Sequence, residues 1–177
     1  WRGQSANAID MVNVAEQDNV TLSTSVCDVN ADPLAEVQAE LGWQPWTSAH
    51  IVLLIPECSG GLDGTYGWAN QGWARTYGGY VVMNGPKSVA AGPQGYRGGV
   101  LAHELGHNLS LGHSQEVICE GGSTAKVPNA APASCVNNPY RGAYSVMGNT
   151  WLGYAPPALT GNESFILGLT GPTSLKS

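Results

Sequence analysis

The sequence HELGHNLSLGH, residues 103–113, contains three of the four histidines in this chain of 177 residues. On a helix, His103 and His107 lie one turn apart and only about 40° apart around the axis, so both imidazoles can face one metal ion. Glu104 lies beside them, where its carboxylate can act as a general base. The spacing of these three residues therefore predicts a helix that carries part of a catalytic metal site.

The third histidine decides what kind of site this is. If the helix continued, His113 would point roughly 240° away from His107. His113 can join the site only if the chain leaves the helix between Ser110 and Gly112 and turns back, and Gly112 is one residue that could allow the turn. The result would be three neutral imidazoles around one Zn²⁺, with a fourth position open for water, as in catalytic zinc sites. The alternative is a surface helix that carries histidines without a metal.

The combined pattern resembles the metzincin metallopeptidases, whose motif is H-E-x-x-H-x-x-G-x-x-H followed by a methionine turn. The string YSVMG, residues 144–148, resembles that turn, with Met147 as its methionine. The two strings are most similar to the gametolysin-like and reprolysin-like branches. One departure is plain, because the motif's glycine falls at Ser110. We expect Ser110 to adopt the left-handed conformation of that glycine, at a cost on the order of 1 kcal/mol.

The resemblance implies a fold of the α/β (α+β) class. Such a fold has a twisted mixed sheet with packed helices above an active-site cleft, and a small irregular lower lobe. We expect residues 1–177 to form a single catalytic domain, with an upper lobe over 1–113 and a lower lobe over 114–177. In the family, a strand placed like Tyr80–Asn84 lies at the edge of the sheet and binds extended substrate, so we expect this of Tyr80–Asn84. An ordinary paired strand is the alternative.

The resemblance also implies the chemistry of a zinc-dependent endopeptidase. His103, His107 and His113 would hold the ion, which lowers the pKa of its bound water and polarises the scissile carbonyl. Glu104 would take the proton from that water and pass it to the leaving amine. Two other readings stay open, namely a catalytically silent, zinc-stapled binding or inhibitory domain and a zinc hydrolase that acts on a non-peptide bond. The silent domain would have no use for the intact Glu104.

Two further residues take roles only through the resemblance. Met147 would lie beneath the three histidines and support them without binding the metal, although a methionine that fills a gap in the core would do much the same. Tyr144 is a candidate for stabilising the oxyanion. Some family members instead place a tyrosine two residues after the methionine, where this chain has Asn149.

Composition limits the partners of the chain. Only 11% of the residues are charged, and the net charge is -6 with seven Lys and Arg, so no basic surface is available for nucleic acid. We expect a protein or peptide substrate and a monomer.

No apolar run approaches the roughly 18 residues of a membrane span. The chain begins at Trp1 without a leader, which is typical of a mature secreted, extracellular protein.

Four cysteines, Cys27, Cys58, Cys119 and Cys135, allow three disulfide pairings. None shows the C-x-x-C spacing of a zinc ribbon or redox pair, so two disulfides in an extracellular protein are expected. We predict Cys119–Cys135, within a stretch that has little core of its own, and Cys27–Cys58, around the first helix and strand. Each could contribute roughly 3 kcal/mol.

Hydrophobic periodicity and turn signals place the other elements. A helix is expected after Asp32, and the run from Ile51 to Ile55 is expected to be a central strand, apolar on both faces. His50, just before it, is expected to be structural. The remaining expectations are a strand within 8–14, an alternating strand over 20–26, an irregular stretch over 116–138 and a short helix capped by Asn162.

Overall fold

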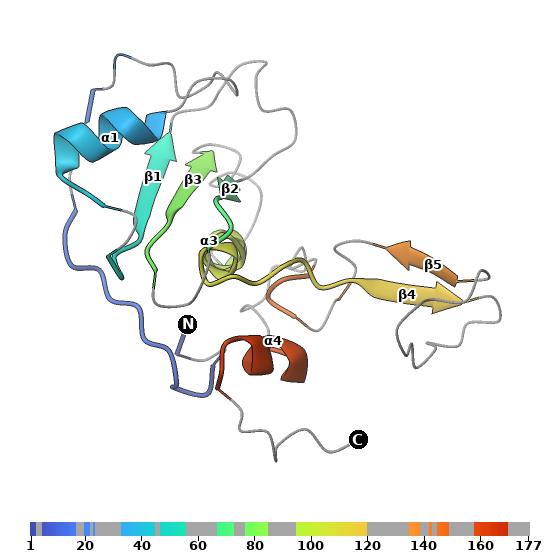
Figure 1. Ribbon diagram of the computed structural model, residues 1–177. Helices are drawn as coiled ribbons and strands as arrows, with labels where there is room; N and C mark the ends of the chain where they lie inside the picture. The colour runs from blue at the N-terminus through green and yellow to red at the C-terminus, as the bar shows by residue number, and fades with distance from the viewer. Residues whose placement is uncertain are drawn as a thin grey trace.

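The structure is a computed structural model that describes thirteen segments: 1–2, 5–16, 20–21, 23, 33–44, 47–55, 67–72, 77–84, 95–119, 135–138, 142, 145–148 and 158–169. Within them the helices are α1 (Pro33–Leu41), α3 (Gly95–Asn108) and α4 (Gly161–Ile166). The strands are β1 (Ile51–Ile55), β2 (Gly67–Ala69), β3 (Tyr80–Asn84), β4 (Glu116–Cys119) and β5 (Cys135–Asn138) (Figure 1). This mixed content confirms the expected α/β class. The predicted division into two lobes at His113 stays a prediction.

The main sheet has the described strand order β1-β3-β2. β1 runs parallel to β3, with Ile51 opposite Tyr80, and β2 runs antiparallel to β3, with Gly67 opposite Met83. The expectation that Tyr80–Asn84 forms the edge of the sheet is therefore wrong, because β3 is paired on both sides. Among the described strands, β1 and β2 lie at the two edges of this sheet.

The expectation that β1 is a central strand, buried on both faces, is also wrong. Alternate residues of β1 face solvent, and the side chain of Leu54 is 78% exposed. The high strand propensity of Ile and Val favours a strand here without burial on both faces, but nothing in the structure explains the apolar residue at Leu54. β3 is the buried strand, since Val81, Val82 and Met83 are nearly inaccessible to solvent.

Helix α3 packs on one face of β3. Val81 and Met83 point to that face and form a cluster with Leu105 of the helix. Val82 points to the opposite face and packs with Ile55 of β1. This alternation follows from the two-residue period of a strand. Leu105 therefore packs α3 against β3, and Figure 1 shows the helix end-on beside β3 and β2.

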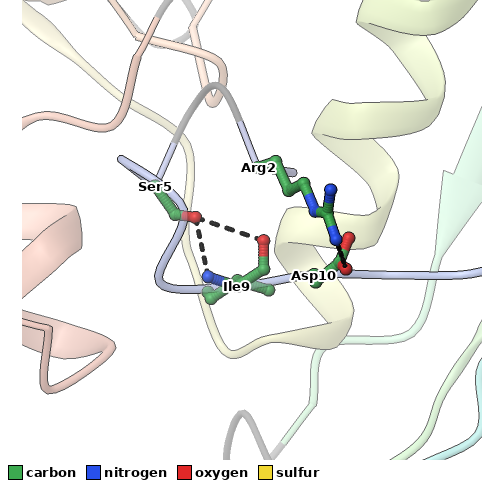
Figure 2. A network of polar contacts seen from close by, with 4 residues as sticks. All are labelled: Arg2, Ser5, Ile9 and Asp10. Atoms are coloured by element: carbon green, nitrogen blue, oxygen red, sulfur yellow. Dashed lines mark hydrogen bonds and ion pairs between the residues drawn. The ribbon is translucent and has the colours of Figure 1, made fainter.

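The N-terminal segment folds under α3 as a loop rather than as the strand expected within 8–14. Ser5 stabilises the loop, because its hydroxyl donates to the Trp1 carbonyl at 2.9 Å and accepts from the Ile9 N–H at 2.8 Å. Figure 2 shows the contact between Ser5 and Ile9 and the ion pair between Arg2 and Asp10, in which Nη2 lies 2.5 Å from Oδ2. Both charged side chains are exposed, so the pair adds little stability. Trp1 and Met11 instead anchor the segment. They pack against the cluster that contains Leu105 and against a second cluster, which includes Ala102 of α3 and Met147.

Two more expectations need correction. The stretch 116–138, expected to be irregular, contains the antiparallel ladder of β4 and β5. The last helix, α4, is capped by Thr160 and not by Asn162, because the Thr160 side chain accepts a hydrogen bond from the Glu163 N–H in a capping box.

The helix at Pro33–Leu41 is confirmed, and Gly42, with a φ of 63°, follows its last residue. The alternating strand expected over 20–26 falls largely outside the described residues.

None of the described helices is long and apolar enough to cross a membrane.

Candidate metal centre

The structure brings the three histidines of the motif together. His103 and His107 lie on α3, and His113 follows the helix. One ligand atom from each lies within 4.8 Å of the other two. The ring centroids of His107 and His113 are 4.6 Å apart, and those of His103 and His113 are 5.3 Å apart. Three imidazoles at this separation can converge on one metal ion.

The helix ends in a turn that returns the chain to the site. The Leu111 N–H donates to the Gly106 carbonyl at 3.0 Å, and the Ser110 N–H donates to the His107 carbonyl at 3.0 Å. These two bonds define a Schellman motif, whose residue after the helix takes a left-handed conformation. Ser110 occupies that position with a φ of 78°, which confirms the expected left-handed serine. Gly112 does not have a positive φ, so the turn is made at Ser110.

Backbone carbonyls fix the tautomers of two histidines. The Nδ1 atom of His103 lies 2.9 Å from the Val146 carbonyl oxygen, and that of His107 lies 2.8 Å from the Leu111 carbonyl oxygen. Since a carbonyl can only accept, both Nδ1 atoms carry the proton and both Nε2 atoms present a lone pair. A carbonyl that accepts from the other ring nitrogen holds a metal-binding histidine in one orientation, so the donor set fits a zinc ion.

Burial keeps the three histidines neutral near pH 7. Burial, together with repulsion from His107 and His113, lowers the pKa of His103 to about 4, although the bond to Val146 acts in the opposite direction. Burial also lowers the pKa of His107 and of His113 below the ordinary value for histidine. Neutral imidazole is the form that binds metals, so few protons compete with a cation for this site.

Glu104, the residue after His103 on α3, is buried as well. It is 8% exposed, and burial raises the pKa of its carboxyl to about 7. A carboxyl that titrates near neutral pH is suited to accept and return a proton. The edge strand β2 lies against this side chain, since a Cβ added at Gly67 would be 3.3 Å from the Glu104 Cγ. The lack of a side chain at Gly67 therefore leaves room for the Glu104 side chain and for the Met83 sulfur, which such a Cβ would approach to 3.0 Å.

Met147 lies under α3 in a turn formed by residues 145–148. The Gly148 N–H donates to the Ser145 carbonyl at 3.0 Å and closes the turn. Met147 is completely buried, and a Cβ added at Gly106 would lie 2.2 Å from its sulfur atom. Gly106 comes between His103 and His107 in the sequence, so the thioether packs against the backbone that carries both ligands.

Sequence reasoning missed Asn108, which has no exposed surface. Its amide nitrogen lies 2.8 Å from the Asn70 carbonyl oxygen and 3.0 Å from the Tyr80 carbonyl oxygen. Its amide oxygen accepts from the Nδ1 of His50 at 3.1 Å. This network ties the last turn of α3 to the start of β3, and it gives His50 the structural role expected for it. The available signal was a polar residue on the apolar, sheet-facing side of the predicted helix.

The remaining candidates lie outside the described residues. They are Tyr144 and the two cysteines Cys27 and Cys58.

Replacing Ser110 by glycine is expected to raise the melting temperature by a few degrees without loss of metal binding. Glycine adopts the left-handed conformation without the cost that a Cβ imposes, which is on the order of 1 kcal/mol. The Ser110 hydroxyl is buried and has no hydrogen-bond partner among the described residues, so removing it also relieves an unpaired polar group. The greater freedom of glycine in the unfolded chain limits the gain.

Ser110→Ala is the matched control, since it removes the hydroxyl but keeps the Cβ. Thermal melts of both variants and of the wild type, with metal analysis, separate the two contributions. A glycine variant that melts clearly below the wild type would show that the serine makes a contact that the turn needs.

A comparison of the sequence with models of known protein families identifies the family of this chain. A sequence model of the reprolysin-like metallopeptidases of family M12B matches residues 9–145, well over half of the chain. The match supports a zinc metalloprotease and a metzincin-like fold, and it ends before Met147. Neither a comparison with curated proteins nor one with solved structures gave a significant match. With the histidine motif inside the matched range, the chain belongs to the reprolysin-like metallopeptidases of family M12B.

Proposed function

We propose that this protein is a zinc-dependent endopeptidase that hydrolyses peptide bonds, with His103, His107 and His113 as ligands and Glu104 as general base. The observation that carries the proposal is the convergence of the three histidines within 4.8 Å, with a buried glutamate next in sequence to the first of them. A binding domain that used the metal only as a staple would have no need of a carboxyl whose pKa burial raises to about 7.

The residues of the site have separate tasks in the proposed reaction. The Nε2 atoms of His103 and His107 are available to bind zinc, because their Nδ1 atoms donate to the carbonyls of Val146 and Leu111. A bound zinc ion supplies Lewis acidity, which lowers the pKa of water and polarises a carbonyl. Glu104 accepts a proton from the attacking water and returns it to the leaving amine. No covalent intermediate with the protein is needed.

The edge strand β2 is the segment that we propose to bind the substrate backbone. It ends the described sheet on the side away from β1, and Gly67 lies against Glu104. An extended peptide can add to such an edge through main-chain hydrogen bonds. This assignment replaces the one made for Tyr80–Asn84, whose main-chain groups are already paired.

We also propose that the protein acts as a secreted monomer stabilised by disulfides. Cys119 and Cys135 lie directly opposite each other in the ladder of β4 and β5, and Cys135 is not a free thiol. These observations support the pair Cys119–Cys135. Peptide mapping without reduction should recover a fragment that joins them, and a fragment that joins Cys58 to Cys119 would refute both predicted pairs.

The proposed function is tested by chelation and metal restoration. Purified protein is assayed on a library of quenched fluorescent peptides as prepared, after removal of metal by a chelator, and after addition of one equivalent of zinc. We expect cleavage within peptide chains that is lost on chelation and regained with zinc. Zinc-loaded, folded protein that cleaves no peptide would refute the endopeptidase and leave the silent binding domain and the hydrolase of a non-peptide bond.

A further inference from the structure

Glu163 is a buried carboxylate on α4, with 6% of its surface exposed. One of its oxygens serves the capping box, because Oε2 accepts from the Thr160 N–H at 2.7 Å. Capping the helix uses only that oxygen. The second oxygen therefore has a different partner and a different role.

The second oxygen is held by Ser145, whose Oγ donates to Oε1 of Glu163. The same hydroxyl accepts from the Met147 N–H at 2.9 Å. Since a hydroxyl has one proton, its donation to the carboxylate leaves its lone pairs for the backbone N–H. Ser145 is 1% exposed, so both bonds lie in the protein interior. Buried bonds of this kind hold their partners in one arrangement.

The turn that Ser145 fixes reaches the metal centre at two points. Its Val146 carbonyl accepts from the Nδ1 of His103 at 2.9 Å. Its Met147 carbonyl accepts from the N–H of Ser114, the residue after His113, at 2.8 Å. The turn therefore contacts one proposed ligand directly and another through its neighbour in the chain.

We propose that Glu163 and Ser145 are positioning residues for the metal centre. Through Ser145, the carboxylate on α4 fixes the turn, and the turn fixes the carbonyl that orients His103. The inference rests on the proposed function, because it takes His103 as a metal ligand. It extends the site to α4, which lies beyond the residues that match the family.

The test measures metal binding rather than turnover. Metal-free Ser145→Ala is titrated with zinc against a chromogenic chelator, and its cobalt form is examined by visible absorption. We expect zinc affinity to fall roughly tenfold, at the lower end of the effect of losing a partner that orients a metal ligand. We also expect a changed cobalt spectrum. Glu163→Gln should weaken zinc binding less, because its single amide oxygen can still accept from Ser145.

Thr160→Ala is the matched control, because it weakens the same capping box and leaves the bond between Ser145 and Glu163 in place. It should lower the melting temperature and keep the zinc affinity and cobalt spectrum of the wild type. Ser145→Thr, which keeps a hydroxyl, should restore binding. Wild-type affinity in folded Ser145→Ala, or an equal loss in Thr160→Ala, would overturn the inference. A wild-type protein that binds no zinc would instead overturn the proposed function.

Discussion

Replacing Glu104 by glutamine is expected to lower kcat by about 10²- to 10⁴-fold and to leave zinc bound. The amide has nearly the same shape as the carboxyl, but it cannot accept a proton from water. The proposed metal ligands are the three histidines, so the metal content should stay at one zinc per chain. Steady-state kinetics on a cleaved peptide, with metal analysis of the same sample, measures both quantities.

Glu40→Gln is a suitable control, since it makes the same change at an exposed position on α1. It should keep wild-type activity. Loss of zinc from Glu104→Gln would show that Glu104 is a ligand, and substantial remaining turnover would show that it is not the base.

The pH dependence of stability offers a second readout for Glu104. Burial raises its pKa from 4.5 to about 7 in the folded, metal-free protein. Between these two values the folded state holds a proton that the unfolded state has released, so this group's contribution to stability falls as the pH rises. The glutamine variant lacks this contribution. Its stability relative to the wild type should therefore rise from pH 4.5 to about 7 and then level off, as measured by denaturant unfolding.

Changing Asn108 to aspartate is expected to lower the free energy of unfolding by about 3 kcal/mol. The substitution keeps the shape of the side chain but replaces its amide nitrogen by an oxygen. That oxygen would face the carbonyl oxygens of Asn70 and Tyr80, which now accept from the amide at 2.8 and 3.0 Å. A carboxyl buried against two acceptors loses both bonds when ionised. In a domain of this size the melting temperature should fall by about 10 °C.

Zinc affinity should fall as well, because Asn108 anchors the turn of α3 that carries His107. Asn13→Asp makes the same chemical change at an exposed position and should shift the free energy of unfolding by less than about 0.5 kcal/mol. An Asn108→Asp variant that melts like the wild type would contradict the network at the end of α3.

The grouping of the histidines could be predicted because its determinants are local. His103 and His107 follow from the helical period, and His113 can join them only through a turn near Ser110. The left-handed conformation of Ser110 was expected from the resemblance, because the glycine of the family's motif falls at this position. Residues that are close in sequence constrain one another through backbone geometry alone, so no knowledge of the sheet was needed.

What could not be predicted depends on contacts between distant segments. The three-residue strand β2 is too short to show a period, and without it β3 could not be recognised as the middle strand. Asn108 meets Asn70, Tyr80 and His50 only after the sheet forms. No role could be predicted for Glu163, because its contact with Ser145 joins residues that are 18 positions apart in the sequence.

The central claim is that three histidines of this chain hold one zinc ion, and X-ray absorption at the zinc edge tests it most directly. For zinc-loaded wild-type protein we predict the scattering of three imidazole ligands with oxygen in the remaining position and no sulfur. His113→Ala, if it retains zinc, should show two imidazoles. A sulfur ligand, or a wild-type spectrum with fewer than three imidazoles, would contradict the account.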